Sequence, residues 1–128
     1  MKFLLDTQLI VWAFYEQKRL SPQARSIMEA RDNQLTFSAA SLWEIAIKRG
    51  QGKREFQFDP RILRRTLLDA GYIELPVLGQ HSVEVDILPP IHKDPFDRLL
   101  AAQALDLRIP LVSRDRVFDL YGVRRIWA

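Results

Sequence analysis

The sequence lacks cysteine altogether and contains only two histidines, His81 and His92, among its 128 residues. The absence of cysteine excludes disulfide bonds, a thiolate nucleophile and zinc held by cysteine. A lone histidine is more often an ordinary side chain than a metal ligand, so we expect both histidines to lie on the surface or in loops. Any metal bound here should therefore be one that accepts oxygen ligands.

Long hydrophobic runs are also absent, which excludes a membrane-spanning class. Hydrophobic residues make up 48% of the chain and charged residues 27%, as in ordinary soluble folds. The first 17 residues, MKFLLDTQLIVWAFYEQ, superficially resemble a signal peptide, but Asp6 interrupts the apolar run and no small-residue cleavage site follows. We expect one globular domain over residues 1–128, in the cytoplasm.

Positive charges only slightly outnumber negative ones, and the formal net charge is +3. Basic residues are nevertheless concentrated in the segment KRGQGKR, residues 48–54, which places four cations around two glycines. The segment fits a polyanionic partner such as RNA. It fits equally well the solvated end of a helix, where basic side chains favour the helix dipole.

Short strand-like segments alternate with helical patterns along the whole chain. The apolar segments typical of buried strands are 2–5, 34–38, 72–75, 109–113 and 123–127. Helical patterns occupy 7–16, 21–32, 39–50, 59–71 and 92–105, with a weaker one at 79–88 and a short turn before the last strand. This alternation predicts an α/β fold in which helices cover both faces of a mostly parallel sheet of about five strands.

Ligands bind beyond the carboxyl ends of parallel strands, which directs attention to the residues that follow each strand. Asp6 follows the first strand, residues 38–44 follow the second, and Asp115 follows the fourth. Asp94 and Asp97 add an acidic pair at the start of a helix.

Two of these acids also have a structural interpretation as helix caps. Asp6 lies between a strand and a helix, where aspartate is a favoured N-cap. Ser41 and Glu44 match the spacing of a capping box. If the helix begins at Ser38, however, Glu44 lies in the second turn, too deep to cap it.

The remaining acids have structural alternatives too. Asp94 precedes Pro95, and aspartate followed by proline is a helix start, so we interpret Asp94 as a cap. Asp97 falls where a carboxylate gains from the helix dipole. Asp115 is compatible with an ordinary acidic turn.

Together, however, these acids predict four carboxylates at one end of a sheet. Ionised carboxylates that converge raise one another's pKa values and normally require a cation. Oxygen ligands with few histidines suit magnesium or manganese better than zinc or copper.

Four motifs resemble those of PIN-domain ribonucleases, in the same order along the chain: LLDT, SAASLWEIAIK, HKDPFDRLLAAQA and LVSRD. The resemblance is closest to VapC-type toxins of toxin–antitoxin pairs, and it implies a three-layer α/β/α sandwich. Matched to the family motifs, the metal-binding and catalytic acids are Asp6, Glu44, Asp97 and Asp115, while Asp94 remains a cap. Asp119 is an alternative to Asp115, and Ser113 stands where the family often has threonine.

The resemblance further implies the function of a toxin that hydrolyses phosphodiester bonds in structured RNA, such as transfer or ribosomal RNA. It implies Mg²⁺ as cofactor, with Mn²⁺ possible, a cognate antitoxin as partner, and a homodimer. Basic residues expected to steer the RNA backbone are Lys48, Arg49, Lys53, Arg54, Arg98 and Arg114.

Other functions fit the sequence less well. A haloacid dehalogenase needs a second aspartate two positions after the first, where this chain has Gln8. A phosphoreceiver needs an early acidic pair and a late lysine, which are not found. The remaining alternative is a non-catalytic RNA-binding or scaffold protein on the same fold.

Overall fold

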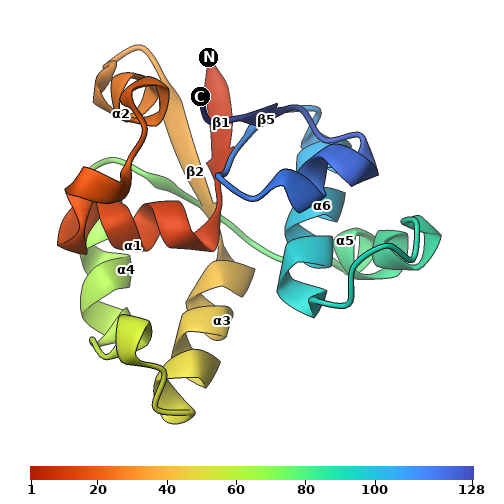
Figure 1. The fold of residues 1–128 in the computed structure, drawn as a ribbon, viewed down its shortest axis with the longest axis horizontal. Coiled ribbons are helices and arrows are strands. Elements are labelled where there is room, and N and C mark those ends of the chain that lie inside the picture. Colours follow the sequence, from red (N-terminus) through yellow and green to blue (C-terminus); the bar gives the residue numbers. More distant parts are fainter.

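The computed structural model describes all 128 residues and contains one sheet of five parallel strands in the order β3-β2-β1-β4-β5 (Figure 1). The strands are β1 (Lys2–Leu5), β2 (Gln34–Ser38), β3 (Ile73–Leu75), β4 (Leu111–Val112) and β5 (Arg125–Ile126). The central strand β1 pairs with β2, for example Phe3 opposite Leu35, and with β4, for example Leu4 opposite Leu111. The predicted parallel sheet is therefore confirmed.

The helices follow the predicted alternation. They are α1 (Thr7–Tyr15), α2 (Pro22–Glu29), α3 (Ala39–Gly50), α4 (Pro60–Asp69), α5 (Gly79–Glu84) and α6 (Pro95–Leu107). Short 3-10 turns occupy Gln17–Arg19, Arg54–Phe56, Val85–Ile87 and Arg116–Tyr121. No helix combines the length and the apolar character that crossing a membrane requires.

Three helices begin with the serine or aspartate cap and proline that the sequence shows. Ser21 accepts from the Ala24 N–H, Asp59 from the Arg61 N–H, and Asp94 from the Phe96 and Asp97 N–H groups. Each carboxylate or hydroxyl satisfies backbone donors that the first turn of a helix leaves without a partner.

Two hydrophobic cores lie on opposite faces of the sheet. Phe3 and Leu5 belong to the core formed with α1, α3 and α4, whereas Leu4 belongs to the core formed with α6. Successive side chains of a strand point to opposite faces, so β1 contributes to both cores. Figure 1 shows α1 and α4 on one side of the sheet and α5 and α6 on the other, which is the predicted α/β/α sandwich.

The sheet places several chain segments at one edge. Asp6 connects β1 directly to α1, and Ser38 connects β2 directly to α3. The Asp6 N–H donates to the Val112 carbonyl at 3.1 Å, which holds the end of β1 beside the end of β4. Residues that follow β1, β2 and β4 therefore meet at the same edge.

Candidate active site

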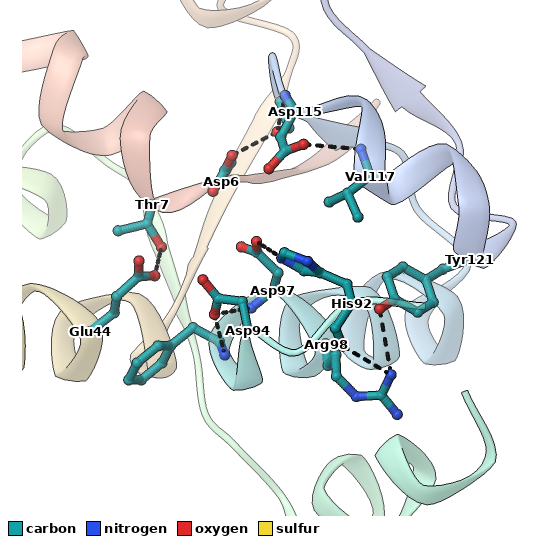
Figure 2. A network of polar contacts seen from close by, with 12 residues as sticks. Asp6, Thr7, Glu44, His92, Asp94, Asp97, Arg98, Asp115, Val117 and Tyr121 are labelled. Carbon is teal, nitrogen blue, oxygen red and sulfur yellow. Dashed lines mark hydrogen bonds and ion pairs between the residues drawn. The ribbon is translucent and has the colours of Figure 1, made fainter. Parts of the chain in front are cut away.

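A polar cleft of about 460 Å³ opens at the carboxyl ends of the strands, and Trp12 is its only hydrophobic lining residue. Figure 2 shows Asp6, Glu44, Asp97 and Asp115 around this region, each from a different segment of the chain. The acidic lining residues are Asp6, Glu44, Glu55, Asp94, Asp97 and Asp115, and the basic ones are Arg19, Lys48, Arg114 and Arg116. The fold thus brings together all four acids predicted from the sequence.

Asp6 occupies the N-cap position of α1, but its side chain makes no capping hydrogen bond. Ser113 Oγ instead donates to Asp6 Oδ2 at 2.6 Å, and the Asp115 N–H donates to Ser113 Oγ at 3.0 Å. Burial raises the pKa of Asp6 to about 6; the Ser113 hydrogen bond opposes this rise, and the charges of Glu44 and Asp115 add to it. The interpretation of Asp6 as a side-chain cap is therefore wrong.

Glu44 is buried in the second turn of α3, because the helix begins after Ser38 and the Ser38 hydroxyl accepts from the Ala40 N–H. The capping box of Ser41 with Glu44 does not form. Thr7 Oγ1 lies 2.7 Å from Glu44 Oε1 and 2.8 Å from Ser41 Oγ. Since a carboxylate only accepts and the Thr7 hydroxyl has one proton, Thr7 donates to Glu44 and accepts from Ser41.

Lys48 pairs with the other oxygen of Glu44 from one turn further along α3. Burial lowers the pKa of Lys48, but the hydrogen bond and the charge of Glu44 outweigh it, with Asp94 and Asp97 contributing, so that the net shift is upward. The ammonium group thus neutralises part of the negative charge of the cleft.

Asp94 and Asp97 play different parts, although three residues separate them. Asp94 Oδ1 accepts from the Phe96 and Asp97 N–H groups, at 2.9 and 3.2 Å, as predicted for a cap. Asp97 Oδ2 lies 3.0 Å from His92 Nε2 (Figure 2). Burial, followed by the charges of Asp6 and Asp94, raises the pKa of Asp97 to about 7, against the effect of the His92 contact.

His92 lies in a loop, as expected, but it also contacts the cleft residue Asp97, which the sequence did not reveal. It lies in the loop before α6, and its ring, Asp94 and Asp97 present ligand atoms within 4.8 Å of one another. A loop residue follows no helical or strand periodicity, so only the folded loop shows this contact. For His81 the expectation of a surface or loop position is wrong, because it is buried in α5, outside the cleft. There the Leu78 N–H donates to Nδ1, and Nε2 therefore donates to Asp106.

The choice between Asp115 and Asp119 follows from their positions. Asp115 lines the cleft, and its Oδ1 accepts from the Val117 N–H at 3.0 Å. Asp119 does not line the cleft and pairs with Arg125 at 2.9 Å, which holds the pKa of this carboxyl below its usual value. The geometry therefore favours Asp115 as the fourth acid.

Only part of the predicted basic surface faces the cleft. Lys48 and Arg114 line it, whereas Arg49, Lys53 and Arg54 are exposed outside it. Arg19 and Arg116 line it without having been predicted. Both belong to 3-10 turns, whose orientation the sequence pattern does not specify.

The prediction that Arg98 steers the RNA backbone is wrong. Its guanidinium donates to the carbonyls of Val85 and Pro89, at 2.9 and 2.8 Å, and lies close to Tyr121 (Figure 2). These bonds tie the loop before α6 to the helix itself. Arg98 therefore holds the loop that carries His92, and it does not line the cleft.

The donor set fits a divalent metal ion. Several carboxylate oxygens face one cleft, and burial, to which neighbouring negative charges add, raises the pKa values of Asp6 and Asp97. A cation favours the ionised form of each carboxyl group. Hard oxygen ligands are those that magnesium and manganese prefer.

The raised pKa values predict how the stability of the metal-free protein changes with pH. Folded Asp6 and Asp97 retain protons to about pH 6 and 7, whereas these groups lose them near pH 3.8 when unfolded. The folded state therefore binds more protons in this range, so the contribution of these two groups to the free energy of unfolding falls as pH rises from about 4 to 7.

Asp97→Asn should flatten this dependence and be at least as stable as the wild type at pH 8. Thermal melts in chelator at constant ionic strength measure it, and the two slopes should differ by on the order of 1 kcal/mol per pH unit. An Asp97→Asn variant that keeps the wild-type slope would contradict the repulsion described here.

Residues 3–123 match the family model of the PIN domain. Similar solved structures include VapBC2 from Rickettsia felis bound to a DNA fragment from their promoter, which has 17% identity, a TM-score of 0.74 and full coverage of both chains. VapC20 from Mycobacterium tuberculosis, a sarcin–ricin loop cleaving toxin, has 12% identity and a TM-score of 0.69 over 98% of this chain and 99% of its own. VapBC-1 from nontypeable Haemophilus influenzae has 18% identity and a TM-score of 0.64 over 98% of this chain and 97% of its own.

The comparison with curated protein sequences gives no significant match. At these low identities the solved structures establish the fold alone. The family model, however, spans the chain from β1 to Val123, shortly before β5, and includes all four acids. The protein therefore belongs to the PIN-domain family.

Proposed function

We propose that this protein is a metal-dependent endoribonuclease and the toxin of a toxin–antitoxin pair, acting in the cytoplasm as one PIN domain over residues 1–128. The observation that carries the proposal is the convergence of Asp6, Glu44, Asp97 and Asp115 on one cleft. Ser113 donates to Asp6, Thr7 donates to Glu44, and His92 contacts Asp97. Hydrogen bonds of this kind orient the side chains that bind a metal ion.

The reaction would be hydrolysis of a phosphodiester bond. A bound magnesium or manganese ion supplies the positive charge that activates water and stabilises the leaving oxygen. Asp6 and Asp97 would hold the ion, and Glu44 and Asp115 would hold a second ion or its waters. Ser113 keeps Asp6 in place and Thr7 keeps Glu44 in place, so both carboxylates are oriented before substrate arrives.

The basic residues of the cleft would bind the RNA backbone. Arg114 and Arg116 are exposed on either side of Asp115, and Arg19 lines the cleft after α1. Their guanidinium groups suit phosphate oxygens. A structured RNA with unpaired bases is the proposed substrate, since VapC20, which shares the fold, is a sarcin–ricin loop cleaving toxin.

We also propose a cognate antitoxin as partner and a homodimer as the working assembly. The likeness to VapBC2 and VapBC-1 supports the antitoxin. The homodimer rests on the family resemblance. A non-catalytic scaffold is the weaker candidate, because it would have no need for four carboxylates gathered in one cleft.

Substituting Asp94 and Asp97 one at a time tests whether Asp97 is a metal ligand and Asp94 only a helix cap. Asp97→Asn should lower RNA cleavage in magnesium by roughly a hundredfold, because it removes a ligand charge. Asp94→Asn should leave cleavage largely intact and change the free energy of unfolding by less than about 0.5 kcal/mol, because asparagine caps nearly as well.

Cleavage assays in magnesium, with melting curves of both variants, check this expectation. Asp94→Asn is the matched control for Asp97→Asn, since both remove one carboxylate charge from the same turn. An Asp97→Asn variant that is slightly destabilised but fully active would show that Asp97 serves only the helix dipole.

Two pairs of basic residues test which surface meets RNA. Replacing Arg114 and Arg116 with glutamine should weaken RNA binding and reduce the salt slope by roughly 1.4, because each phosphate that a cation neutralises on a single strand contributes about 0.7. Replacing Lys53 and Arg54 with glutamine removes the same charge outside the cleft and should have little effect. Binding measured across a salt series distinguishes them, and the reverse ranking would move the RNA path to the end of α3.

A further inference from the structure

Trp43 is the most exposed aromatic side chain of the protein, with 62% of its surface accessible. It lies on α3, and its ring contacts that of Phe96, in the first turn of α6, edge to face at a centroid distance of 5.3 Å. The contact fixes the orientation of the indole while leaving most of it open to solvent. An exposed, oriented aromatic ring of this kind is suited to stacking.

Neither Trp43 nor Phe96 lines the cleft, but each is the chain neighbour of a carboxylate that does. Trp43 directly precedes Glu44 on α3, and Phe96 directly precedes Asp97 on α6. Consecutive residues of a helix project about 100° apart, so each aromatic side chain occupies the helix face next to that of a cleft carboxylate. The same Asp94 carboxylate that lines the cleft binds the Phe96 N–H.

The surroundings of the pair favour a nucleic acid base over a protein surface. The cleft beside α3 and the start of α6 is lined by charged side chains, among them Lys48 and Asp94, and the core of a protein interface is depleted in charge. The other strongly exposed apolar side chains near α6, Val83 and Ile87, belong to α5 and the turn that follows it. Trp43 and Phe96 therefore form a small aromatic patch, and the arginines of the cleft, Arg19, Arg114 and Arg116, supply the charge that complements a phosphate backbone.

We propose that Trp43, braced by Phe96, is a stacking platform for one unpaired base of the bound RNA, next to the nucleotide whose phosphate enters the cleft. The platform rests on the proposed ribonuclease function and deepens it. Stacking requires a base that is free of its neighbours, so the site selects single strands, loops or ends over continuous duplex.

The test compares binding of a polyanion with bases and one without. Wild-type protein, Trp43→Phe and Trp43→Leu are titrated in chelator, which prevents cleavage, with a single-stranded RNA of mixed sequence, about 20 nucleotides long so that it exceeds one binding site, and with linear polyphosphate. Trp43→Leu should weaken RNA binding by roughly 5- to 150-fold, the effect of losing one stacked base. Trp43→Phe should retain most of the affinity, and polyphosphate binding should be the same in all three.

Tyr15→Leu is the control, because Tyr15 is a second exposed aromatic residue that stacks on another ring, Phe58, and does not line the cleft. It should bind RNA as the wild type does. RNA should also quench tryptophan emission of the wild type, and the quenching should be clearly smaller in Trp43→Phe, in which Trp12, a lining residue of the cleft, and Trp127 remain.

Four results would overturn the platform. Equal RNA affinity of Trp43→Leu and wild type would remove it and leave the ribonuclease proposal standing. An equal loss of RNA and polyphosphate binding would show that Trp43 stabilises the structure of the cleft and does not stack on a base. A shift of Trp43→Leu from dimer to monomer in sedimentation would assign the ring to a second copy of the chain. A wild-type protein that neither binds nor cleaves RNA would refute the proposed function itself, and the platform with it.

Discussion

Burial of carboxylates away from water, to which their mutual repulsion adds, decides how this site is built. Asp6 is buried at the end of the central strand, and Asp97 faces it from α6, with their pKa values raised to about 6 and about 7. The fold holds them by individual hydrogen bonds, from Ser113 to Asp6 and between His92 and Asp97. Lys48 supplies the compensating charge at Glu44. Such an arrangement lowers the free energy of unfolding, and binding of a divalent cation to the folded state would raise it again.

The position of the site follows from the order of the strands. The chain runs from β1 outward to β2 and β3, and then crosses to β4 and β5 on the other side of β1. The strand order therefore reverses between β1 and β4, where ligands of open α/β sheets bind beyond the carboxyl ends. Asp6 leaves β1 at this point, and Ser113 and Asp115 leave β4 at the same point. Parallel pairing alone places these groups together.

Much of this arrangement could be predicted from the sequence, because strands, helix starts and the acids after them have local signals. Proline after Asp94 correctly indicates a cap, and the start of α3 after Ser38 correctly places Glu44 too deep to cap. The predictions fail at residues whose contacts have no local pattern in the sequence. Asp6 has the position of a cap but its side chain bonds to Ser113, 107 residues away along the chain. His92 and Arg98 depend on a loop whose path only tertiary contacts specify, so the sequence reveals neither the contact of His92 with Asp97 nor the structural role of Arg98.

Calorimetric titration of manganese into the metal-free protein near pH 7, in two buffers of different ionisation enthalpy, tests whether the acidic cleft binds a metal ion. We expect saturable binding at millimolar concentration or below, with release of a fraction of a proton, because Asp97 with a pKa of about 7 must lose its proton to bind a cation. The release should vanish above about pH 8, where the carboxyl is already ionised. Absence of saturable binding, or binding with no proton release near pH 7, would contradict the account.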